Sequence, residues 1–183
     1  MVLYLIRHGK TTANEQHLYC GASDLPLSEA GIDELRALSY EIPEPVRFLT
    51  SGMKRTAQTM ELLFGGRPYG IDRDFREVDF GVFELHSYEE LKDDPAYLAW
   101  ISGDNEANVP PRGESGNQMK RRVLAALERL RKENRDTVLI CHGGTIAVLM
   151  AALFPAQQKS RYQWQPAPGH GYRIEGGSYE KIP

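Results

Sequence analysis

Residues 2–9 of this 183-residue chain read Val2-Leu3-Tyr4-Leu5-Ile6-Arg7-His8-Gly9. The first five form a continuous apolar run, which is typical of a strand that is buried on both faces of a sheet. A second run ends in the same way and reads Thr137-Val138-Leu139-Ile140-Cys141-His142-Gly143-Gly144. If the two strands are parallel neighbours, His8 and His142 leave the sheet at the same edge and can meet.

Apolar residues at helical spacing alternate with the strand-like runs. The spacing predicts helices over residues 28–40, 53–64, 115–134 and 143–153, and strands over 46–49, after Pro68 and around 172–174. Residues 88–100 are predicted to be helical with a break near Pro95, and 105–116 to form a loop. We therefore expect an α/β fold, a three-layer sandwich with a mostly parallel central sheet flanked by helices. One domain is expected over residues 1–183, with a loop and helical cap segment around 83–116.

The composition excludes several classes of protein. Hydrophobic residues make up 41% of the chain and the formal net charge is −3, so neither nucleic acid nor an anionic membrane surface is an expected partner. No apolar run approaches the roughly 20 residues of a membrane span, and no signal-peptide pattern precedes Arg7. The two cysteines, Cys20 and Cys141, argue against a disulfide framework and for a cytoplasmic location. The sequence leaves the oligomeric state open.

Polar motifs follow one another along the chain in a specific order. They read Arg7-His8-Gly9 with Asn14 six positions after the histidine, Tyr19-Cys20-Gly21, Asp24-Leu25-Pro26-Leu27-Ser28, Ser51-Gly52-Met53-Lys54-Arg55-Thr56-Ala57-Gln58-Thr59, Phe75-Arg76-Glu77-Val78-Asp79-Phe80-Gly81, Pro111-Arg112-Gly113-Glu114-Ser115 and His142-Gly143-Gly144. In this order the motifs resemble those of the histidine phosphatase, or phosphoglycerate mutase-like, superfamily, from Val2 to about Leu153. Within that superfamily the chain is most similar to the α-ribazole phosphatase and broad-specificity phosphatase branch.

The resemblance implies a metal-independent phosphomonoesterase of the acid phosphatase type, without a cofactor, that acts on a small phosphorylated metabolite such as α-ribazole 5′-phosphate. It implies that His8 takes the phosphoryl group, that Arg7, Arg55 and His142 bind phosphate oxygens, and that Glu77 donates a proton. These residue types suit phosphoryl transfer, which depends on positioning and on neutralising charge. Arginine can bind two phosphate oxygens through paired, charge-assisted hydrogen bonds, and a neutral imidazole nitrogen is a nucleophile.

The same resemblance makes four further residues candidates for contact with the substrate: Asn14, Cys20, Gly21 and Gly143. For Cys20 a small apolar filler is the competing interpretation. Glu77 is preferred to Glu84 as the proton donor because of its place before Phe80-Gly81. The chain departs from the family at Phe83-Glu84-Leu85, where a glycine usually follows the glutamate, so the substrate-side wall can differ from that of relatives.

Other functions are weighed against this one. A mutase would return the phosphoryl group to the same small acid, but the chain is short for a phosphoglycerate mutase. A catalytically silent phospholigand-binding module would not need His8, Arg55, Glu77 and His142 together. A metal-dependent hydrolase needs a ligand cluster, and His17, His86 and His170 have no spacing that suggests one with His8 or His142. Taken singly, the arginines could be surface charges and His142 a core histidine that caps a helix.

Overall fold

The central sheet determines where the chain's polar strand ends lie. The computed structural model describes residues 1–104 and 106–183, so Asn105, the first residue of the predicted loop, lies outside the described residues. The described residues form one six-stranded sheet with the order β3-β2-β4-β1-β5-β6. Its strands are β1 (Leu3–Arg7), β2 (Arg47–Thr50), β3 (Gly70–Ile71), β4 (Thr137–Cys141), β5 (Gly171–Glu175) and β6 (Ser178–Ile182). The first four are mutually parallel, whereas β5 and β6 are antiparallel to their neighbours.

The pairing of β1 with β4 confirms the expectation that the two histidines leave the same edge. The strands run parallel with Arg7 opposite Cys141, and the His8 N–H donates to the Cys141 carbonyl at 3.0 Å. His8 and His142 are therefore the first residues beyond two adjacent strand ends.

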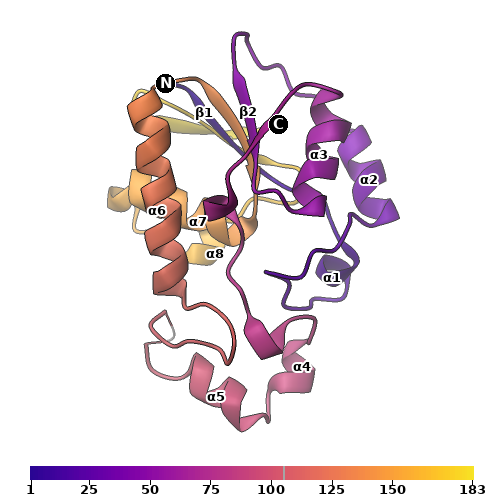
Figure 1. Cartoon of the computed structure of the whole chain (residues 1–183), viewed down its shortest axis with the longest axis vertical. Coiled ribbons are helices and arrows are strands. Elements are labelled where there is room, and N and C mark those ends of the chain that lie inside the picture. Colours follow the sequence, from indigo (N-terminus) through magenta and orange to yellow (C-terminus); the bar gives the residue numbers. More distant parts are fainter. Residues whose placement is uncertain (105) are drawn as a thin grey trace.

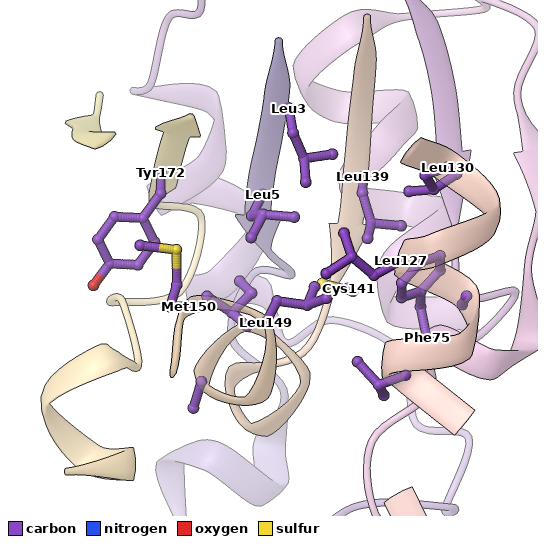
Figure 2. Packing of buried hydrophobic residues seen from close by; sticks show 14 of the residues in the cluster. Leu3, Leu5, Phe75, Leu127, Leu130, Leu139, Cys141, Leu149, Met150 and Tyr172 are labelled. Atoms are coloured by element: carbon purple, nitrogen blue, oxygen red, sulfur yellow. The ribbon is translucent and has the colours of Figure 1, made fainter. Parts of the chain in front are cut away.

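Helices cover both faces of the sheet, as the three-layer prediction requires (Figure 1). One face carries α2 (Glu29–Arg36) and α3 (Lys54–Phe64); the other carries α6 (Gly116–Glu133), α7 (Gly143–Leu153) and α8 (Arg161–Trp164). Side chains of β1 alternate between the two, because successive residues of a strand point to opposite faces. Leu3 and Leu5 belong to the core that packs against α6 and α7, which Figure 2 shows from close by. Tyr4 and Ile6 pack on the α3 side, so β1 is buried on both faces.

Local signals in the sequence explain where the helices begin. The Ser28 hydroxyl accepts the Gly31 N–H at 3.1 Å and caps α2, and a Ser115 capping box begins α6. The predicted break near Pro95 is a helix start: α4 (Tyr88–Leu91) ends before it, and α5 (Pro95–Ile101) has the proline in its first turn. Helix α2 ends earlier than predicted, at Arg36.

Several short elements were not predicted because they are too short to show a periodicity. They are α1 (Thr12–Glu15), α8, β6 and the 3₁₀ turns η1 (Arg73–Phe75), η2 (Gly81–Phe83) and η3 (Pro155–Gln157). For β6 the sequence did carry a signal, since Gly176 and Gly177 both have positive φ in the hairpin turn between β5 and β6.

Helices α4 and α5 lie apart from the sheet, beyond the carboxyl ends of the parallel strands, at the bottom of Figure 1. Their own small core contains Phe83, Leu91 and Tyr97, with Tyr19 and Trp100 packed against it. This places an aromatic cluster over the sheet edge from which His8 and His142 emerge. In the described part of the chain, no helix has the length and apolar character needed to cross a membrane.

Candidate active site

His8 is held in the state that a nucleophile needs. Its side chain is 5% exposed, and Nδ1 lies 2.6 Å from the Gly9 carbonyl oxygen. Because a carbonyl only accepts, Nδ1 carries the hydrogen and Nε2 is left with its lone pair. Burial lowers the pKa of His8 well below its ordinary value, and the charges of Arg55 and Arg7 lower it further, against the Gly9 hydrogen bond. The imidazole is thus neutral at physiological pH.

Two arginines lie beside His8 and present unused donors. Arg7 donates from Nη1 to the Pro166 carbonyl at 2.9 Å, and its buried Nε has no hydrogen-bond partner among residues 1–104 and 106–183. Arg55 is 1% exposed. Burial lowers the pKa of both guanidinium groups and the Glu77 carboxylate opposes this. Buried positive charge of this kind is expected to be balanced by an anion.

The loop around Gly21 is held from both sides by charged side chains. Arg55 donates to the carbonyls of Ser23 at 2.8 Å and Gly21 at 2.7 Å. The Glu84 carboxylate accepts the N–H groups of Gly21, Ala22 and Ser23, and also that of Phe80, at 2.9–3.1 Å. Only glycine fits at position 21, because a Cβ there would lie 1.6 Å from the Val78 carbonyl oxygen. Glu84 is therefore committed to holding this loop.

His142 is fully buried, and a chain of hydrogen bonds assigns its tautomer. Arg55 Nε donates to His142 Nδ1 at 3.3 Å, so Nδ1 is unprotonated and Nε2 bears the hydrogen. The His142 Nε2–H points to the Ser51 hydroxyl at 2.8 Å. Ser51 in turn lies 3.2 Å from the Thr56 hydroxyl, which donates to the Met53 carbonyl. Burial, followed by the charge of Arg55, lowers the pKa of His142 well below its ordinary value. Its ring lies 5.1 Å from that of His8, centroid to centroid.

Glu77 lies at the amino end of α7, which follows His142. Its carboxylate accepts the Gly144 N–H at 2.7 Å and the Val78 N–H at 3.0 Å. A Cβ on Gly144 would lie 2.3 Å from Glu77 Oε1, so the glycine allows this close approach. Of the two glutamates considered from the sequence, Glu77 is the one that faces the cavity described next.

A cavity of about 310 Å³ lies above these residues, and both Arg7 and Glu77 line it. Tyr19, Phe80 and Trp100 form an aromatic wall, with ring centroids 5.0–6.0 Å apart. The remaining lining residues are Leu18, Cys20, Val78, Ile101, Glu106, Glu114, Gly116, Gly144, Arg161, Tyr162 and Gln165. His8, Arg55 and His142 are buried and do not themselves line the cavity. The cavity therefore combines positive charge from Arg7 with an aromatic wall.

Of the other four residues predicted to contact the substrate, only Cys20 is among the residues that line the cavity. Cys20 lines the cavity, and burial raises the pKa of its thiol. Gly21 points its N–H to Glu84 and its carbonyl to Arg55, so both groups are already occupied. Gly143 lies against Arg7: a Cβ on it would be 3.3 Å from the guanidinium. Asn14 lines a neighbouring hollow with Arg7, and its Oδ1 accepts from the Thr11 backbone.

Sequence reasoning missed Ser51, which holds His142, and Arg161 and Gln165 of the cavity wall. Ser51 carried a usable signal, because it is the polar residue directly after β2, the parallel neighbour of β4. Arg161 begins the short helix α8 and Gln165 directly follows it; four residues are too few to show an apolar periodicity in the sequence. Among the described residues, no three His, Cys, Asp or Glu side chains are arranged to hold a metal ion.

Comparison with known proteins gives a consistent picture. The family model described as "Histidine phosphatase superfamily (branch 1)" matches residues 3–181. A Salmonella typhimurium protein named "Adenosylcobalamin/alpha-ribazole phosphatase" is 30% identical over 190 residues, which cover all of this chain and 90% of that protein. A Yersinia pestis protein named "Probable phosphoglycerate mutase GpmB" is 29% identical, over 94% of this chain and 90% of its own. The crystal structure of the α-ribazole phosphatase from Shigella flexneri superposes with a TM-score of 0.83 at 26% identity, covering 98% of this chain and 93% of that one.

The two buried histidines predict a pH-dependent stability. Their pKa values are lowered in the folded chain, so below the ordinary value of 6.5 unfolding takes up protons that the folded state does not bind. The free energy of unfolding is therefore retained above pH 6.5 and falls below it, by about 1.4 kcal/mol per pH unit for each histidine. Urea unfolding in phosphate-free buffers from pH 7.5 to 5.5 measures this slope. Between pH 7.5 and 5.5, His8→Gln should lose less free energy of unfolding than the wild-type protein, by about 1.4 kcal/mol in total; parallel curves for the two proteins would contradict the assignment.

Proposed function

The chain belongs to the histidine phosphatase superfamily and is a phosphatase, and from this premise we propose that it hydrolyses a small phosphomonoester through a phosphohistidine on His8. The observation that carries the proposal is the state of His8. Its imidazole is neutral, Nδ1–H is held by the Gly9 carbonyl, and Nε2 keeps its lone pair next to the buried Arg55 and the half-buried Arg7. A neutral nucleophile beside fixed positive charge suits attack on a phosphate dianion.

In the first step the phosphoryl oxygens take the free donors of Arg7 and Arg55. His8 Nε2 attacks phosphorus in line with the ester oxygen, the N–P bond forms and the P–O bond breaks. Glu77, in its protonated form, gives its proton to the departing oxygen. In the second step water attacks the phosphohistidine, Glu77 takes the proton of that water, and inorganic phosphate and neutral His8 are released.

His142 contributes a donor only after a change of protonation. In the described state its Nε2–H is directed to Ser51 and its Nδ1 accepts from Arg55. An incoming dianion favours the imidazolium form. The new Nδ1–H and the Arg55 Nε–H are then both donors, so their mutual hydrogen bond is replaced by bonds to phosphoryl oxygens, while Ser51 continues to accept from Nε2. Ser51 and Thr56 thus keep the ring oriented through the change.

The aromatic wall supports a substrate whose alcohol carries a planar ring. Tyr19, Phe80 and Trp100 line the same cavity as Arg7, and aromatic faces favour stacked or edge-to-face contact with such a ring. α-Ribazole 5′-phosphate has a benzimidazole of this kind, and we name it as the preferred substrate. Residues 83–116, which contribute Trp100 and Glu106 to the cavity lining, act as a cap within one domain. The free thiols Cys20 and Cys141 support a cytoplasmic location.

Substrate preference is testable by release of inorganic phosphate from a panel of phosphomonoesters. We expect hydrolysis of α-ribazole 5′-phosphate with a higher kcat/KM than that of 3-phosphoglycerate, and no loss after exhaustive EDTA treatment. The matched variant Trp100→Ala should reduce kcat/KM for α-ribazole 5′-phosphate far more than for glycerol phosphate, since only the former has a ring to stack. Isomerisation of 3-phosphoglycerate without phosphate release would instead identify a mutase, and activity restored only by added Mg²⁺ or Zn²⁺ would identify another class of hydrolase.

The two glutamates should respond differently to substitution. Glu77→Gln removes the proton donor, which is worth roughly 10²–10⁴-fold for a poor leaving group. It should cripple hydrolysis of an alkyl phosphate and largely spare p-nitrophenyl phosphate, whose phenolate leaves without a proton.

Glu84→Gln is the control. An amide NH₂ cannot accept the backbone N–H groups that Glu84 now binds, so the loop that anchors Arg55 loosens. Both substrates should then lose activity to a similar degree. If the leaving-group dependence is found in Glu84→Gln and not in Glu77→Gln, the proton donor is Glu84.

A further inference from the structure

The guanidinium of Arg122, on α6, forms hydrogen bonds with all five of its N–H groups. Two bonds, from Nε at 2.7 Å and Nη2 at 2.6 Å, form a bidentate pair with the Glu114 carboxylate. The other three go to the main chain: Nη1 donates to the Asp74 and Arg76 carbonyls at 2.7 Å, and Nη2 to the Glu77 carbonyl at 3.0 Å. Arg122 is half-buried, so these bonds are partly protected from water.

The carbonyls that Arg122 binds belong to the segment that carries Glu77. On the other side of this segment, the Thr145 hydroxyl of α7 lies 3.2 Å from the carbonyls of Phe75 and Arg76, and the Gly144 N–H reaches the Glu77 carboxylate. The backbone of Glu77 is therefore fixed between α6 and α7. Among residues 1–104 and 106–183, Arg122 is the one residue of α6 that donates a hydrogen bond to the Glu77 carbonyl.

Glu114 links this arrangement to the cavity. It lines the cavity, and its backbone N–H donates to the Asp79 carbonyl at 2.8 Å. The same residue thus orients the Arg122 fork and ties the end of the cap segment to the stretch that follows Glu77. The Arg122–Glu114 ion pair, together with the three carbonyls that Arg122 binds, thus sets the position of the Glu77 segment and of the end of the cap segment.

We propose that Arg122 and Glu114 form a positioning unit for proton transfer: they fix the backbone of Glu77 so that its carboxylate reaches the leaving oxygen. This rests on the proposed role of Glu77 as proton donor. Neither residue touches the reacting atoms, and both act through Glu77. The geometry requires arginine, because lysine has three donors on one nitrogen and cannot span a carboxylate and three separate carbonyls.

The test is Arg122→Lys, assayed with an alkyl phosphate and with p-nitrophenyl phosphate. A small displacement of a catalytic group can cost on the order of 10²-fold. We expect a loss of about that size in kcat/KM for the alkyl phosphate and a rate near that of wild type for p-nitrophenyl phosphate. Loss of a merely structural ion pair would lower both rates together, so the ratio of the two rates is the informative quantity.

Arg129→Lys is the matched control. Arg129 lies two helical turns further along α6 and also binds the segment before Glu77, but through the side chains of Asp72 and Asp74 at 2.7–3.2 Å. Its replacement leaves the carbonyls of residues 74, 76 and 77 bound by Arg122, so the ratio of the two rates should equal that of wild type.

The outcomes separate the two claims. If Glu77→Gln changes the ratio and Arg122→Lys does not, the positioning unit is overturned and Glu77 keeps its role. If Glu77→Gln does not change the ratio, the proton-donor role fails and the positioning proposal fails with it. If Arg122→Lys gives no cooperative thermal transition, Glu114→Gln replaces it as the test: a raised sensitivity to the leaving group supports the proposal, and an unchanged ratio overturns it.

Discussion

Parallel pairing of β1 with β4 is the constraint on which the site depends. With Arg7 opposite Cys141, the next residues of both strands emerge side by side at one edge of the sheet, and these residues are His8 and His142. Strand β2 pairs with the other side of β4 and delivers Ser51 to the same edge. A slip of this register would separate the nucleophile from the second histidine, and no side-chain rotation could restore the contact. Apolar side chains on both faces of β1 resist such a slip.

Around that edge, charged side chains hold main-chain segments in place. In the loop around Gly21, Arg55 binds a backbone carbonyl and Glu84 accepts backbone N–H groups. Arg122 binds backbone carbonyls of the segment that carries Glu77. Buried or half-buried charges are costly unless they are hydrogen-bonded, and these groups are satisfied by backbone as well as by each other. The result is a set of donors that is in place before the phosphate arrives, which is how a polar site stabilises developing charge without reorganisation.

Much of the framework could be predicted from the sequence, and the limits have physical reasons. Continuous apolar runs located β1 and β4, helical spacing located α6, and the glycine turn after His142 located α7; the strand-end rule was enough to bring His8 and His142 together. The sequence favoured Glu77 over Glu84 only through its place before Phe80-Gly81, because the physical difference lies in which backbone N–H groups each carboxylate faces after folding. Arg122 stands next to the buried Val123 and is one of several charged residues on α6, and its main-chain acceptors come from a segment more than forty residues away. Contacts of that range leave no local pattern.

We propose that all of these contacts serve a covalent phosphohistidine on His8, which rapid-quench labelling with a ³²P-phosphomonoester detects most directly. Wild-type protein mixed with substrate and quenched within one turnover should carry a labelled adduct that is labile to acid and stable to base, and His8→Ala should carry none. Wild-type protein that turns over under the same conditions without any such adduct would contradict nucleophilic attack by His8.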